Sequence, residues 1–195
     1  MDDHEHVVQL LHTRNAVDQE ISRIIQRPMS TGHLGEWLAS RIFGIDLHPS
    51  ATHTGSDGVF ADGPQAGRTV NIKWYSKREN LLDISTVGPP DTYLVMTGPP
   101  SAAASSRGAL RPLCVENVYL FDHDEVVAAL TARGTKIGIA SSLVKAQWTA
   151  AEVFPAASPR LPLSDEQKHA LILLRSSSGE DSVADALAVV KLPQR

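Results

Sequence analysis

The chain has 195 residues, a formal net charge of −4 and 42% hydrophobic residues, values typical of a globular protein large enough for one buried core. No apolar run approaches the length of a membrane-spanning helix, and the acidic, polar N-terminus argues against a signal peptide. The single cysteine, Cys114, rules out an internal disulfide and favours a cytoplasmic location. The acidic charge weighs against a dedicated nucleic-acid-binding protein, because phosphate contacts supply most of such binding.

Two helices are predicted at the start of the chain. Residues 5–27 carry apolar side chains at every third or fourth position, and Pro28 ends the pattern. Its heptad-like spacing also suits a homodimer contact, although three turns are too few to establish a coiled coil. Ser30 can cap a second helix that runs to about Phe43. Glu36 lies opposite the apolar stripe of that helix, where a charged side chain is usually solvated. Its small and apolar neighbours on that side instead favour contact with a sheet edge or a phosphate.

Residues 55–75 predict a β-hairpin with a Gly/Pro-rich connection. The second strand alternates, so that Asn71, Lys73 and Tyr75 share one face and apolar residues share the other. Asp57, at the start of the first strand, can lie beside them in the simplest register. A carboxylate, an amide oxygen and a lysine on one surface can hold a hard divalent cation and orient a water. The alternative is an ordinary hairpin whose polar face is solvated.

Three short motifs carry a resemblance to a known family: Gly-Glu at 35–36, Ser-Asp-Gly at 56–58 and Asn-Ile-Lys at 71–73. Over about residues 30–121, they resemble the PD-(D/E)XK, or restriction-endonuclease-like, nuclease superfamily. The resemblance implies an α/β core, a small mixed sheet flanked by helices, and Mg²⁺- or Mn²⁺-dependent hydrolysis of phosphodiester bonds in DNA. It implies a metal site and a catalytic lysine, made by Asp57, Glu36, the Asn71 side-chain oxygen, the Ile72 backbone carbonyl and Lys73.

The sequence departs from the family pattern at one position. The usual acid two residues before the lysine is Asn71 here, and an amide oxygen can ligate a hard metal only without charge. The substitution leaves open a second function, that of a catalytically inactive fold-mate that binds nucleic acid or a protein partner. A third possibility is an interaction protein that dimerises through its N-terminal helix and C-terminal tail.

Basic side chains on two segments are predicted to contact the DNA backbone. Lys77 and Arg78 follow the hairpin, and Arg107 and Arg111 lie in a Gly/Pro/Ser-rich loop over 98–112, for which disorder is the alternative. The histidines at 33, 48 and 53 match no zinc spacing, so surface or supporting roles are preferred for them.

The rest of the chain predicts further strands and helices in order. Residues 79–84 predict a short helix or loop, 92–97 and 114–121 two buried strands, and 122–134 a capped helix. A short edge strand at 136–140 and a short helix or an irregular segment over 142–153 follow. We expect residues 1–154 to form the nuclease-like domain with its N-terminal helix. Residues 155–195 are expected to form a Pro/Ser-rich linker and a helical appendage that docks on the core or on a partner chain. Within the appendage, Ser164 is expected to start one helix and residues 183–190 to form a last, weak one.

Overall fold

The computed structural model describes residues 2–49, 55–100 and 112–175. Contacts between residues divide the chain into two units. One spans Gly35–Ser176; the other contains Met1–Leu34 and the residues from Ser177 onward, which lie outside the described ranges. The helix α1 (Asp3–Ile25) belongs to the second unit, and α2 (Thr31–Phe43) begins there and continues into the first. Among the described residues, no helix combines the length and apolarity needed to cross a bilayer.

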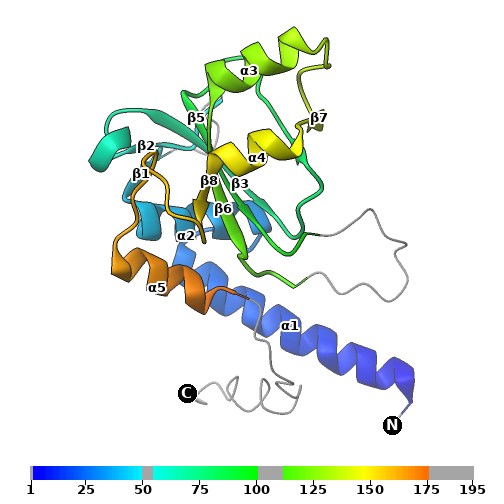
Figure 1. The fold of residues 1–195 in the computed structure, drawn as a ribbon. Helices are drawn as coiled ribbons and strands as arrows, with labels where there is room; N and C mark the ends of the chain where they lie inside the picture. The colour runs from blue at the N-terminus through cyan, green and yellow to red at the C-terminus, as the bar shows by residue number, and fades with distance from the viewer. Residues whose placement is uncertain (1, 50–54, 101–111, 176–195) are drawn as a thin grey trace. The chain divides into compact units, whose positions relative to one another are not determined.

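A six-stranded mixed sheet forms the centre of the Gly35–Ser176 unit, as Figure 1 shows. The strand order is β1-β2-β3-β5-β6-β8, in which β3 and β5 are parallel and the other neighbours are antiparallel. The strands are β1 (Ile45–Leu47), β2 (Gly58–Phe60), β3 (Thr69–Tyr75), β5 (Thr92–Thr97), β6 (Asn117–Asp122) and β8 (Glu152–Phe154). The remaining elements are the 3-10 helix η1 (Gly63–Gln65), β4 (Leu81–Leu82), α3 (His123–Ala132), β7 (Ser141–Ser142), α4 (Lys145–Ala151) and α5 (Asp165–Leu173). The predicted mixed α/β fold is therefore confirmed.

The predicted alternation of β3 is also confirmed, and it separates the two faces of the sheet. Val70, Ile72 and Trp74 are buried on one face. The helix α2 packs on this face at Gly35, where an added Cβ would lie 3.2 Å from the Cβ of Trp74. The opposite face of β3 therefore carries Asn71 and Lys73.

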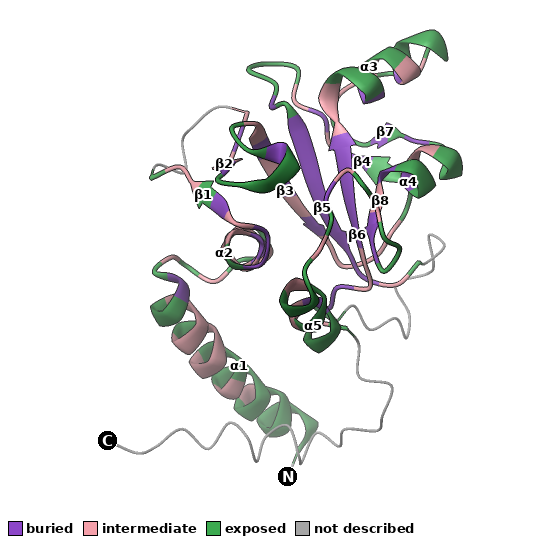
Figure 2. Ribbon diagram, turned by 60° about the vertical axis from the view of Figure 1, so that its left-hand side comes forward, coloured by how far each residue is buried: buried purple, intermediate pink, exposed green. Residues whose placement is uncertain are grey.

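That opposite face continues into a buried hydrophobic cluster. Side chains of β5 and β6 pack there against α3 and α4, and Figure 2 colours both central strands as buried. Trp148 of α4 is 1% exposed and makes edge-on ring contacts with Tyr119 and Phe121, at centroid distances of 4.8 and 5.0 Å. Burial of three aromatic rings fixes α4 against the sheet.

Several short elements differ from the prediction. Residues 79–84 contain the strand β4, which pairs with β7 in a separate two-stranded sheet. The predicted edge strand at 136–140 is displaced to 141–142, and the predicted helix over 142–153 ends at Ala151 and continues as β8. A strand of two or three residues is too short to show an alternation of apolar and polar side chains, so its position depends on pairing with another strand.

The described part of the predicted appendage, residues 155–175, packs on the sheet unit. Leu161 and Leu171 are buried, and Gln167 donates a hydrogen bond of 2.7 Å from Nε2 to the carbonyl of Ile42. Ser164 accepts a hydrogen bond from the Gln167 N–H and so caps α5, the helix expected to start there. The predicted last helix, over 183–190, lies outside the described residues.

One side chain fixes the start of β3 beside the start of β5. Asp91 Oδ2 accepts hydrogen bonds from the Thr69 hydroxyl and N–H, at 2.7 and 2.8 Å, which lower the pKa of this carboxyl. Its contribution to stability is complete above the ordinary aspartate pKa and is lost as the pH falls through the lowered folded-state pKa.

We expect Asp91→Ala to lower the free energy of unfolding by less than about 1 kcal/mol at neutral pH, because water screens this exposed group. The deficit should shrink as the pH falls to about 2.5. Urea unfolding over that pH range measures it, with the exposed Asp46→Ala on β1 as the control. If the loss of unfolding free energy in Asp91→Ala instead grew as the pH fell, the lowered pKa of Asp91 would not be the cause of its contribution to stability.

Candidate functional site

Asp57 lies immediately before β2, and three hydrogen bonds hold it in the hairpin. Its N–H donates to the Val70 carbonyl at 2.8 Å, and its carbonyl accepts from the His48 N–H at 2.9 Å. Its side-chain Oδ2 accepts from the Ile72 N–H at 2.6 Å. Because β2 pairs with β3 only at Thr69 and Val70, the carboxylate takes the place that a continued β2 backbone would occupy. The carboxylate is thus held against β3.

The side-chain amide of Asn71 forms a hydrogen bond to the turn that precedes Asp57. Its Nδ2 donates to the Gly55 carbonyl at 3.2 Å, two residues before Asp57. Gly55 has a φ of 90°, and an added Cβ would lie 1.5 Å from the Gly88 carbonyl oxygen, so only glycine lets these two loops meet. The Asn71 Oδ1 is buried and accepts no hydrogen bond from the described residues. A buried oxygen without a partner typically costs about 1–3 kcal/mol, so its presence calls for a ligand or a water.

Ile72 and Lys73 complete the polar side of this strand. The N–H and C=O of a strand residue point to the same neighbouring strand, so the Ile72 carbonyl is directed toward the side of β3 on which its N–H meets Asp57. Lys73 is half-buried on the face of Asn71, opposite Val95 of β5. Within the described ranges, its ammonium makes no hydrogen bond or ion pair.

Tyr75 and Asp83 extend the polar face toward the end of β3. The Tyr75 hydroxyl lies 3.2 Å from Asp83 Oδ2 and accepts from the Asp83 N–H at 3.2 Å. Burial raises the pKa of Tyr75 far above its usual value, so the phenol stays neutral and acts through hydrogen bonds. The sequence offered no signal for this pairing, because it depends on how 81–85 folds back over the sheet.

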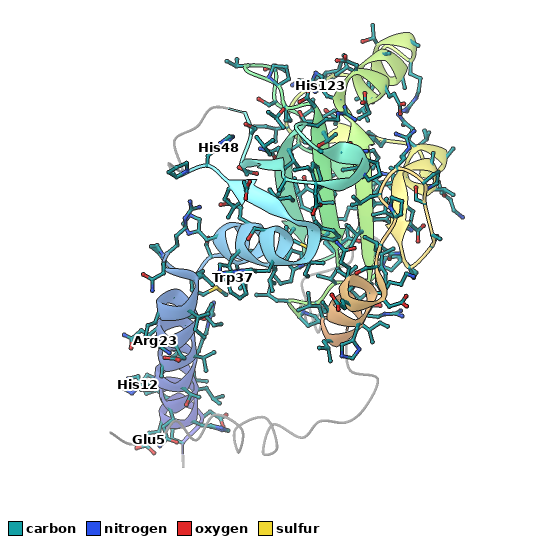
Figure 3. The ribbon with its side chains drawn as sticks, turned by 90° about the vertical axis from the view of Figure 1, so that its left-hand side faces the viewer. Glu5, His12, Arg23, Trp37, His48 and His123 are labelled. Carbon is teal, nitrogen blue, oxygen red and sulfur yellow. The ribbon has the colours of Figure 1, made fainter. Side chains whose placement is uncertain are left out.

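His48 and Ser56 form a second contact that the sequence did not predict. His48 Nε2 lies 3.0 Å from the Oγ of Ser56, a residue that is 7% exposed. His48 lies at the end of β1 and can be followed in Figure 3. Together with its backbone bond to Asp57, this contact supports the turn that carries the carboxylate.

Glu36 comes from α2, the helix that packs on the Trp74 face of β3 through Gly35. Asn71 and Lys73 project from the opposite face of β3, whereas Glu36 is carried by this helix. Its place among the metal ligands stays a prediction.

Of the four basic side chains predicted to contact DNA, two interact with other residues of this chain and two lie outside the described ranges. Lys77 forms a 2.6 Å ion pair with Glu79, and Arg78 donates to the Tyr119 hydroxyl at 2.9 Å. Arg78 Nε is buried without a partner in the described part of the chain. Arg107 and Arg111 fall in the segment that the structure does not describe.

The oxygen donors of this turn fit a hard divalent cation better than a soft one. They comprise the Asp57 carboxylate and the Asn71 Oδ1, which has no partner among the described residues. The Ile72 carbonyl is directed toward the side of β3 on which Asp57 lies. No three His, Cys, Asp or Glu side chains within the described ranges gather as a metal site. With one fixed carboxylate and an amide, the donor set carries little charge, and weak affinity is expected.

Comparisons with known proteins add no family name: no protein-family model matches the chain, and no curated protein matches it. The functional assignment therefore depends on the contacts described above.

Proposed function

We propose that this chain is a restriction-endonuclease-like, metal-dependent nuclease that hydrolyses phosphodiester bonds in DNA. The observation that supports this most directly is the buried Asn71 Oδ1, which accepts no hydrogen bond from the described residues. The next residue of β3, Ile72, holds the Asp57 carboxylate by its N–H. Lys73, on the same face and without a partner there, supplies a positive charge at that point. An oxygen pair and an ammonium on one surface suit a phosphate bound to Mg²⁺ or Mn²⁺.

Each residue has a distinct role in the proposal. Asp57, the Asn71 Oδ1 and the Ile72 carbonyl hold the cation, with Glu36 as a further ligand. A cation held there would lower the pKa of a bound water molecule and would stabilise negative charge on the phosphate. Lys73 orients the attacking water and neutralises the phosphate, a task that suits a compact ammonium on a strand. Tyr75 stays neutral and holds Asp83 beside this face.

DNA contact and location belong to the same proposal. The DNA backbone would be held by basic side chains that follow β3 and by those of the 98–112 loop, namely Lys77, Arg78, Arg107 and Arg111. Lys77 would exchange Glu79 for a phosphate. The lone, buried Cys114 suits a reducing compartment, which supports the cytoplasm.

A binding protein without catalysis is the second candidate, favoured by one specific feature. Asn71 gives the metal site no charge where the family pattern has an acid. Such a fold-mate would keep the fold and bind nucleic acid or protein without hydrolysis.

A cleavage assay on the full-length protein distinguishes the two. Plasmid and single-stranded DNA are incubated with Mg²⁺, with Mn²⁺ or with a chelator, and we expect products only where a divalent cation is present. Activity that an Asp57→Ala variant retains would come from a contaminating nuclease. If the folded wild-type protein binds DNA without cutting it under any of these conditions, the binding candidate replaces the nuclease.

A further inference from the structure

The helix α1 presents an apolar stripe that the described structure leaves largely exposed. Along its length, Val7, Leu10, Leu11 and Ile24 are 54%, 41%, 48% and 51% exposed. With 3.6 residues per turn, these positions fall on one side of the helix, together with the half-buried Val17 and Ile21. An exposed stripe of this kind, on a helix about 34 Å long, marks an interaction surface.

Two charged residues interrupt the stripe at its middle. Arg14 and Asp18 project from the same side as the apolar residues and form an ion pair of 3.7 Å within the helix. Asp18 lies four residues beyond Arg14, so the pair is centred near position 16, close to the midpoint of α1. A surface with opposite charges placed evenly about its midpoint is complementary to a copy of itself turned end to end.

The ends of α1 favour the same orientation through the helix dipole rather than through their side chains. Glu5 and Arg23, which Figure 3 labels near the two ends of the helix, lie on the side of α1 away from the stripe, and Arg23 forms an ion pair with Glu20 within the helix. In an antiparallel pair, the positive start of each helix dipole lies beside the negative end of the other. A parallel pair would set like ends of the two dipoles side by side.

We infer that α1 is a self-association surface through which two copies of this chain pair side by side in antiparallel orientation. Centred near residue 16, the pairing sets Arg14 opposite Asp18 of the second copy and Leu11 opposite Ile21. Val7 then meets the Ile24 region, so the exposed ends of the stripe cover each other. This inference is independent of whether the site near Asp57 hydrolyses DNA.

The composition of α1 favours a second copy over other acidic surfaces. Its acids are Asp3, Glu5, Asp18 and Glu20, against the arginines at 14 and 23. A helix with this acidic balance is repelled by anionic lipid and by phosphate, whereas membrane-surface helices are typically rich in Lys and Arg.

Sedimentation of the full-length chain over about 1–200 µM tests the pairing. The expected result is a shift from the 21.0 kDa chain toward twice that mass. Arg14→Asp and Asp18→Arg should each raise the dimer dissociation constant by about tenfold or more, because like charges then face each other. The exposed Gln19→Asp, on the other side of α1, should leave it unchanged.

Mixing the two charge variants separates pairing between helices from the ion pair within one helix. Each variant has like charges at positions 14 and 18, so neither regains its internal pair. An equimolar mixture should nevertheless form a heterodimer with nearly wild-type affinity. No recovery on mixing would overturn the inference, and circular dichroism of each variant confirms that the helix content is intact.

Disulfide formation then tests the orientation in a Cys114→Ala background. Val17→Cys, near the centre, should form a cross-linked dimer, whereas Val7→Cys should not, since its two copies would lie roughly 25 Å apart. Equal cross-linking at both positions would overturn the antiparallel arrangement. A full-length chain that stays monomeric while one ending at Arg175 dimerises would show that the chain's own C-terminal residues cover the stripe, which also overturns the inference.

Discussion

Replacing Lys73 with methionine is expected to slow metal-dependent DNA cleavage by about 10²–10³-fold, the usual loss when a charge placed at a developing oxyanion is removed. Lys73 is half-buried beside Val95, and methionine keeps an unbranched apolar stem for that contact. The ammonium has no hydrogen bond or ion pair within the described ranges, so its removal leaves no described group without a partner. The fold should therefore persist while the chemistry is lost.

The measurement is the single-turnover cleavage rate at saturating Mg²⁺, combined with thermal unfolding in the same buffer. Because Lys73 is not among the proposed ligands, Mg²⁺ should stabilise Lys73→Met at least as well as the wild type. Lys136→Met removes an exposed ammonium far from β3 in sequence and serves as the matched control. A Lys73→Met rate within about threefold of the wild-type rate would place the lysine outside the chemistry.

The features that the sequence predicted correctly are those that neighbouring residues in the chain determine. The alternation of Thr69–Tyr75 places Asn71 and Lys73 on one face without any tertiary information. Asp122 and Ser164 are the N-caps of α3 and α5. The side chain of each accepts a hydrogen bond from the backbone N–H three residues later. These signals are local, and the structure reproduces them within a residue or two.

The details of the site depended on contacts between distant residues. That the Asp57 carboxylate meets the N–H of Ile72 follows from where β2 stops, which no pattern around Asp57 indicates. The Asn71 amide donates to the Gly55 carbonyl, and Gly55 in turn approaches Gly88, a contact between loops 33 positions apart in the chain. The face that α2 covers, and therefore the position of Glu36, was likewise set by packing of Gly35 on Trp74.

Asn71→Asp should make the stability of the protein depend on divalent cations. In a chelator, the new carboxylate loses the amide hydrogen bond to the Gly55 carbonyl and adds a negative charge near Asp57, at a cost of about 1–3 kcal/mol. In Mg²⁺, the same charge strengthens the proposed ligand set. If Mg²⁺ is present at about 100 times its dissociation constant, binding restores about 2.7 kcal/mol. Cleavage should rise together with metal affinity.

Urea unfolding of the wild type and of Asn71→Asp, each with a chelator and with Mg²⁺, measures this coupling. Gln65→Glu is the matched control, because Gln65 is also buried and its amide donates to a backbone carbonyl, that of Arg160, at 2.8 Å. Arg68 donates to the Gln65 Oε1 at 3.1 Å and would pair with the new carboxylate, which offsets part of the lost hydrogen bond. Any change in the stability of the control should be equal in both conditions, because its contacts include no proposed metal ligand. If Asn71→Asp behaves in the same way as the control, the buried Oδ1 is not a cation ligand. In that case the amide holds Gly55 in place, and the face it shares with Lys73 is better explained as a binding surface.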